Sequence, residues 1–171
     1  MGSISKTGAP GAATGLDGFS APAGLGFADG GECARRDAMT LMHLGHLDAL
    51  KRELTPRENL RAWCALHEVA ADAATLDAAF VELGIAAVAD LPIAQLSAGQ
   101  RRRAALARLA VSRAALWLLD EPTTHLDAQG QRVVAALIDA QLARGGAVVA
   151  ASHLPLGVRG RVTELALDGA A

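Results

Sequence analysis

From about residue 39 onward, the hydrophobic and polar positions alternate between strand-like and helix-like patterns. Short continuous apolar runs, which are typical of strands, occur at 39–47, Ala115–Leu119, Ala147–Ala151 and Val162–Leu167. The runs at Ala115–Leu119 and Ala147–Ala151 are expected to be buried strands, the former covered on both faces. Helical patterns lie between the runs, so the order of elements predicts an α/β fold with a parallel sheet.

Four segments carry the signals of helices. The first begins at Thr55, with Pro56 as the first helical residue and Glu58 placed to complete a capping box. The other three are expected over 71–83, 98–112 and 128–143. Because the stretch 55–95 is helical throughout, it is expected to be an insertion on the sheet.

The composition narrows the class of protein. Of the 171 residues, 51 % are hydrophobic and 20 % are charged, which excludes a chain disordered throughout. The net charge of -2 gives no basic field for nucleic acid. No apolar run approaches the roughly 18 residues of a membrane-spanning helix. The two cysteines are too few for a disulfide scaffold and fit a reducing cytosol.

The first 34 residues differ from the rest of the chain. Nine of the 18 glycines lie within residues 1–31, and the stretch 8–31 shows neither helical nor strand periodicity. On composition alone, a flexible linker is one reading of this stretch. We therefore divide the chain into a glycine-rich segment, 1–34, and a globular domain, 35–171.

Two adjacent carboxylates end the strand expected at Ala115–Leu119. In open parallel sheets, ligands bind at the carboxyl ends of the strands. Asp120 can hold Mg²⁺ there through water, and Glu121 can orient or deprotonate an attacking water. The alternative is a surface turn that starts before Pro122.

A second candidate is the start of the third helix, in the segment LSAGQRRR (96–103). Ser97 caps the helix, Gly99 allows close approach of a ligand, and the free N–H groups of the first turn favour a phosphate. The alternative is an ordinary capped helix whose arginines form a solvated face. His153, after the strand at Ala147–Ala151, lies at the same expected sheet edge, although a lone histidine is more often structural.

Three segments, taken in order along the chain, resemble four motifs of the ABC-type ATPases. LSAGQRRR is similar to the signature motif, WLLDEPTTHLD to the Walker B motif followed by the D-loop, and SH to the switch histidine. Over about residues 35–165, the chain is further similar to the ATP-binding subunits of haem exporters in cytochrome c maturation. The resemblance implies a P-loop NTPase-like core with a parallel sheet and a helical subdomain at about 55–98. ATPase subunits of other ABC transporters are the alternative within this class.

The resemblance also implies roles for individual residues. Asp120 holds Mg²⁺ through water, Glu121 acts on the hydrolytic water, and His153 contacts the γ-phosphate of ATP.

Other implied residues face a second copy of the chain. Ser97, Ala98, Gly99 and Gln100 present the helix N-terminus to ATP held by that copy, and Asp127 lies across the same seam. The implied unit is an ATP-sandwich dimer that drives a transmembrane permease from the cytoplasmic face of the inner membrane. No nucleic acid is expected as a partner.

The phosphate loop departs from the family pattern. The motif G-x-x-x-x-G-K-[ST] has only a remnant here, in which Lys6 would meet the phosphates and Thr7 would meet Mg²⁺. Aligned on Lys6, the remnant has Ser3 and Ser5 where the family has glycines, and the first loop glycine would fall before Met1. We therefore expect an incomplete phosphate loop and N-terminal strand, caused by a damaged reading frame or a misassigned start.

A second departure concerns the glutamine that links nucleotide and transporter in this family. Leu47 stands at about that position, with His46 and Asp48 as possible substitutes. Both departures keep open an interpretation from another class: a catalytically impaired remnant that acts only as an interaction module.

Overall fold

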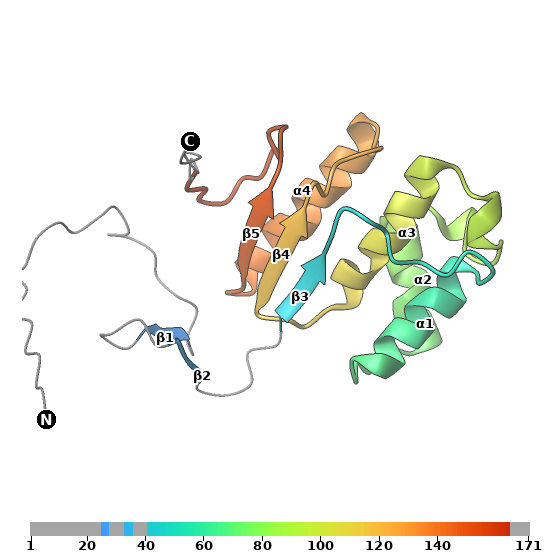
Figure 1. Ribbon diagram of the computed structural model, residues 1–171, viewed down its shortest axis with the longest axis horizontal. Helices are drawn as coiled ribbons and strands as arrows, with labels where there is room; N and C mark the ends of the chain where they lie inside the picture. The colour runs from blue at the N-terminus through green and yellow to red at the C-terminus, as the bar shows by residue number, and fades with distance from the viewer. Residues whose placement is uncertain (1–24, 28–32, 36–40, 165–171) are drawn as a thin grey trace, which may run out of the picture.

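The computed structural model describes residues 25–27, 33–35 and 41–164. A three-stranded parallel sheet lies at its centre, in the order β3–β4–β5 (Figure 1). Its strands are β3 (Leu41–Leu44), β4 (Leu116–Asp120) and β5 (Ala147–Ala151). The register pairs Leu44 with Leu119, and Asp120 with Ala151, so the strands end at a common edge. The predicted parallel α/β architecture is confirmed.

A separate antiparallel pair consists of β1 (Leu25–Phe27) and β2 (Cys33–Arg35). The sequence pattern predicted no strand here, because an element of three residues is too short to show an alternation.

All four expected helices are confirmed. They are α1 (Pro56–Leu66), α2 (Ala73–Glu82), α3 (Ala98–Val111) and α4 (Ala128–Ala143). Two short 3₁₀ turns, η1 (Ala86–Val88) and η2 (Ile93–Gln95), lie between α2 and α3.

Local chemistry sets the start of α1 and the end of α2. The Thr55 hydroxyl accepts a hydrogen bond from the Glu58 N–H at 3.1 Å, and the Glu58 carboxylate accepts one from the Thr55 N–H at 2.9 Å. This is the predicted capping box, and Pro56 loses no hydrogen bond at the first helical position. Just beyond α2, Gly84 turns the chain with a φ of +66°, a backbone conformation that glycine adopts without strain.

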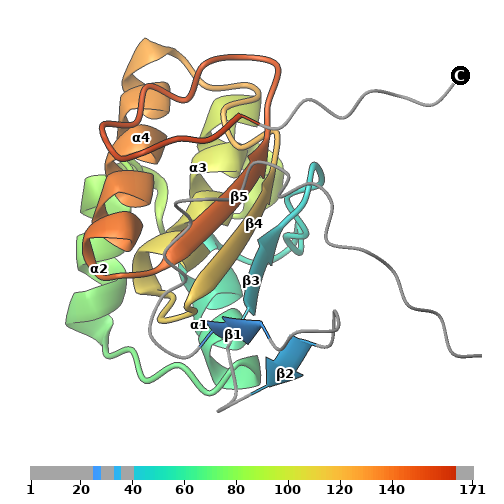
Figure 2. The same ribbon diagram turned by 90° about the vertical axis from the view of Figure 1, so that its left-hand side faces the viewer.

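Helices α3 and α4 cover one face of the sheet (Figure 2). Alternate strand residues, among them Met42, Leu44, Trp117 and Leu119, are buried on that side. Helices α1 and α2 pack against α3 at the end away from β5 (Figure 1). Phe80, which is 0 % exposed, lies in the core between these helices. The Arg57 guanidinium carbon lies over the Phe80 ring, 5.5 Å from the ring centroid.

Within the part of the chain that the structure describes, Ala115–Leu119 is not covered on both faces and Ala147–Ala151 is not buried, so both expectations are wrong. Leu41 and Val149, on the sheet face opposite the helices, are 50 % and 58 % exposed, and β4 alternates between buried and half-buried positions. The reason is that α3 and α4 both lie against the same face. The strand expected at Val162–Leu167 is also not observed in its described part, since residues 162–164 have no regular structure. The rest of that segment lies outside the described residues.

Candidate functional site

The two carboxylates at the end of β4 lie where the chain leaves the sheet. Asp120 is the last residue of the strand, and Glu121 has a φ of +46°, in the left-handed region. The Glu121 N–H donates to the carbonyl oxygen of Ala151 at 2.9 Å, which extends the contact with β5 by one residue. The turn after the strand is therefore tied to the sheet edge.

Glu121 and His153 come together from the ends of neighbouring strands. The Glu121 Oε1 atom accepts a hydrogen bond from the His153 N–H at 3.0 Å and lies 3.6 Å from the His153 Nε2 atom. The Glu121 side chain is 21 % exposed and the imidazole 96 % exposed. The arrangement thus presents an accessible imidazole beside a carboxylate at the sheet edge predicted for both residues.

Asp120 has the chemistry of a Mg²⁺ ligand. Within the described part of the chain, its carboxylate makes no hydrogen bond or ion pair. Over the same residues, no group of three or more histidine, cysteine, aspartate or glutamate side chains is arranged to hold a metal. A single free carboxylate fits a Mg²⁺ ion that keeps most of its water ligands.

The start of α3 has the predicted cap. The Ser97 hydroxyl accepts from the Gln100 N–H at 3.2 Å, and the Gln100 Oε1 atom accepts from the Ser97 N–H at 2.9 Å. The cap leaves the N–H groups of Ala98 and Gly99 in the first turn without an intrahelical acceptor. A Cβ atom at Gly99 would lie 3.1 Å from the carbonyl oxygen of His125, so the glycine lets the 121–127 loop approach closely.

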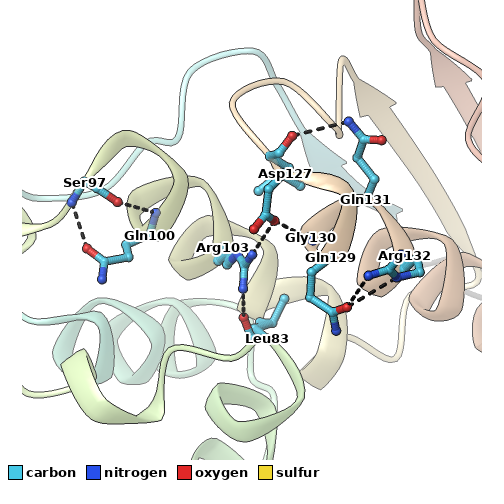
Figure 3. A network of polar contacts seen from close by, with 10 residues as sticks. Leu83, Ser97, Gln100, Arg103, Asp127, Gln129, Gly130, Gln131 and Arg132 are labelled. Carbon is cyan, nitrogen blue, oxygen red and sulfur yellow. Dashed lines mark hydrogen bonds and ion pairs between the residues drawn. The ribbon is translucent and has the colours of Figure 1, made fainter.

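Asp127 has two roles in the structure, both visible in Figure 3. Its Oδ1 atom caps α4 by accepting from the Gly130 N–H at 2.8 Å, and it accepts from Arg103 of α3 at 2.5 Å. The hydrogen bond from Gly130, and then the Arg103 guanidinium, lower the pKa of this carboxyl. Arg103 also donates to the carbonyl oxygen of Leu83, so it joins three segments.

A surface pocket of about 310 Å³ lies at this junction. It is lined by Gly84, Ile85, Ser97, Gly99, Gln100, Arg103, His125 and Asp127. Four of the predicted site residues therefore line one pocket, whereas Asp120, Glu121 and His153 lie at the sheet edge. Ala98 is in the first turn of α3 but does not line the pocket. Lys6 and Thr7 lie outside the described residues.

The three consecutive arginines do not form the solvated face given as one reading of this helix. Arg102 is 2 % exposed, while Arg101 and Arg103 are half-buried, and each donates to at least one backbone carbonyl. Successive helix positions point about 100° apart, so three in a row cannot all face water on a helix packed on two sides. The helical spacing of three consecutive arginines was therefore the feature of the sequence that could have predicted a buried arginine.

The loop after β3 carries Leu47 and the two possible substitutes for the glutamine. Leu47 is 80 % exposed and His46 is exposed, whereas the Asp48 carboxylate pairs with Arg102 at 3.2 Å. Arg108 of α3 donates to the carbonyl oxygen of Ala49 at 2.7 Å. Of the two possible substitutes for the glutamine, Asp48 is therefore already engaged inside the protein.

Comparisons with known proteins agree with the fold and the motifs. The model of the ABC transporter family matches residues 30–124, so the chain belongs to this family. In structure, a Pyrococcus furiosus protein described as an ABC transporter ATP-binding protein aligns with a TM-score of 0.60 at 18 % identity, over 67 % of this chain and 57 % of that one. That likeness shows the ABC ATPase fold.

Relatives with closer sequences carry a more specific name, "Cytochrome c biogenesis ATP-binding export protein CcmA". The Rhodopseudomonas palustris (strain BisB18) protein is 50 % identical over 129 residues, which are 75 % of this chain and 62 % of that protein. The Vibrio cholerae protein is 47 % identical over 113 residues, 66 % of this chain and 55 % of that protein. The chain thus spans about three fifths of the length of these relatives. No helix among the described residues has the length and apolarity to cross a bilayer.

Proposed function

We propose that the chain is the ATP-binding and ATP-hydrolysing subunit of an ABC exporter that serves haem export in cytochrome c biogenesis. Its membership in the ABC transporter family and the names of relatives that are 47–50 % identical support this proposal.

The observation that carries the proposal is the Glu121–His153 contact beside Asp120 at the edge of the sheet. Glu121 would accept a proton from the attacking water, because a carboxylate fixed by one hydrogen bond keeps a second oxygen free. The exposed His153 imidazole would donate to the γ-phosphate. Asp120, with Thr7, would hold Mg²⁺, which when bound neutralises charge on the phosphates.

The other half of the proposed site lies on the pocket side of α3. The free N–H groups at the start of this helix and the helix dipole favour a phosphate, and Ser97, Ala98, Gly99 and Gln100 form this start. Asp120, Glu121 and His153 do not line this pocket, so the phosphate it receives would come from ATP on a second copy, with Asp127 at the same seam. Such a dimer would act on a transmembrane permease at the cytoplasmic face of the inner membrane.

A second candidate function is an interaction module without hydrolysis. The specific observation in its favour is Ser5, which stands beside Lys6 where the phosphate loop of the family has glycine. A Cβ atom there restricts the backbone where a phosphate must approach closely. In that case Lys6 and Thr7 would not hold ATP and Mg²⁺.

The test is phosphate release from MgATP by the full chain, compared with Glu121→Gln. The glutamine keeps an oxygen that accepts from the His153 N–H but cannot take a proton, so a loss of about 10²- to 10⁴-fold in turnover is expected with unchanged folding. Glu82→Gln makes the same chemical change at an exposed position of α2 and is the matched control. A chain that neither binds a fluorescent ATP analogue nor releases phosphate would favour the interaction module over the ATPase.

A further inference from the structure

Arg102 of α3 is the most deeply buried charged side chain among the residues that the structure describes, at 2 % exposed, and it lies at the sheet edge. We propose that it is a positioning residue for the Glu121 carboxylate, tying the turn after β4 to the loop after β3. The inference rests on the hydrolytic role proposed above for Glu121.

The guanidinium of Arg102 bridges two segments that are distant in the sequence. On one side, NH1 donates to the carbonyl oxygen of Gly45 at 3.1 Å and to the Asp48 carboxylate at 3.2 Å. On the other side, NH2 donates to the carbonyl oxygens of Asp120 at 3.1 Å and Glu121 at 2.8 Å. Four acceptors from two loops therefore converge on one planar group.

These contacts hold a backbone that would otherwise relax. Glu121 has a positive φ, a backbone conformation that is strained for a residue with a Cβ atom. Its N–H is held by Ala151, and its carbonyl by Arg102 and by the Thr124 N–H at 3.2 Å. Since backbone direction at Glu121 sets where its side chain points, the guanidinium controls whether the carboxylate meets His153.

Only arginine suits this position. The guanidinium presents donors in a rigid fork that reaches both sides at once, whereas a lysine ammonium is one point on a flexible stem. The neighbouring arginines bind other segments. Arg101 donates to the carbonyl oxygen of Leu96, and Arg103 donates to the carbonyl oxygen of Leu83 and to the Asp127 carboxylate. The Asp48 carboxylate supplies the charge that compensates the buried guanidinium.

The experiment measures Arg102→Lys in the full chain by two readouts. The first is MgATP turnover, for which we expect kcat to fall by about 10- to 100-fold with KM changed by less than about twofold, because a misplaced base slows chemistry without weakening binding. The second is NMR hydrogen exchange of the Glu121 amide, expected to quicken at least about tenfold while amides in the middle of α4 keep their rates. Arg132→Lys is the control, because among the described residues this α4 arginine bonds Gln129 alone, and it is expected to match the wild type.

The outcomes separate this inference from the proposed function. If the wild-type chain releases no phosphate, the hydrolytic function fails and the exchange readout alone decides the positioning of Glu121. The inference is overturned if hydrogen exchange at the Glu121 amide is unchanged, or if kcat is unchanged in an active chain. It is also overturned if the faster exchange is spread evenly over α4. If Arg102→Lys does not fold, Asp48→Asn removes only the charge pairing. Faster exchange confined to Glu121 and its turn then supports the inference, and wild-type exchange overturns it.

Discussion

The side-chain amide of Asn59 in α1 holds the loop that precedes this helix. The residue is 8 % exposed, and both halves of the amide are used. Its Oδ1 atom accepts from the Lys51 N–H at 2.8 Å, while Nδ2 donates to the carbonyl oxygens of Lys51 at 3.1 Å and Thr55 at 2.9 Å. Asn59→Asp is therefore a sharp perturbation, because it keeps the size and the acceptor but turns the donor into a charged oxygen.

The expected magnitude follows from these three hydrogen bonds. At pH 7 the aspartate loses both donated bonds and points an anionic oxygen at two carbonyls, which we expect to lower the free energy of unfolding by about 3 kcal/mol. Protonation of the new carboxyl restores one donor, so the loss in the free energy of unfolding shrinks to about 1 kcal/mol. Burial and the facing carbonyls raise the pKa of the new carboxyl in the folded state. The stability regained by protonating this carboxyl is therefore fully present below the unfolded pKa of about 3.9. It is lost as the pH rises through the higher pKa of the folded state.

The assay is urea unfolding followed by circular dichroism at pH 7.5 and pH 4.5, with the wild type measured at both. Asn59→Ala is the matched control: it should lose about 2–3 kcal/mol at either pH, since alanine does not titrate. A deficit of the aspartate variant that stays the same at the two pH values, or that is under about 1 kcal/mol at pH 7.5, would refute the reasoning.

Two further predictions concern the helical unit and the start of α4. Phe80→Ala removes a fully buried ring and should cost about 3–5 kcal/mol by urea unfolding, against about 1 kcal/mol for Phe80→Leu; equal losses would contradict a close-packed site. The hydrogen bond from Gly130, and then Arg103, lower the pKa of the Asp127 carboxyl in the folded state. The ionised carboxylate therefore stabilises the fold above the unfolded pKa, and this stabilisation is lost as the pH falls through the lower folded pKa. Asp127→Asn should therefore show a smaller drop in Tm between pH 5 and pH 3 than the wild type, measured by thermal unfolding, and an equal drop would show that this carboxyl does not contribute.

Local signals in the sequence predicted most of the elements. The capping residues Thr55 and Ser97 mark helix starts because each satisfies backbone N–H groups within its own first turn. The apolar runs before Asp120 and before His153 likewise predicted two strands and a shared edge for the residues that follow them. The exposure of Val149 was not predictable, because which faces of a sheet are covered depends on where distant helices pack.

The roles of the arginines in α3 lay beyond the sequence pattern as well. Arg102 contacts Asp48 across 54 positions, and Arg103 contacts Asp127 across 24. Contacts of this kind have no periodic signature, since they depend on how α3 is rotated against the sheet and the loops. The division of the chain at residue 34 and the roles of Lys6 and Thr7 remain predictions from the sequence.

By itself, then, the sequence determined the helices, the parallel strands and the order of motifs that places the chain among ABC ATPases, because caps, periodicity and strand-end carboxylates are local properties. Only the tertiary structure decided that Glu121 meets His153, that Asp127 is shared by α4 and Arg103, and that a buried guanidinium joins two loops. The physical reason is that a hydrogen bond between distant segments forms only after packing has excluded water and brought its donor and acceptor within about 3 Å of each other.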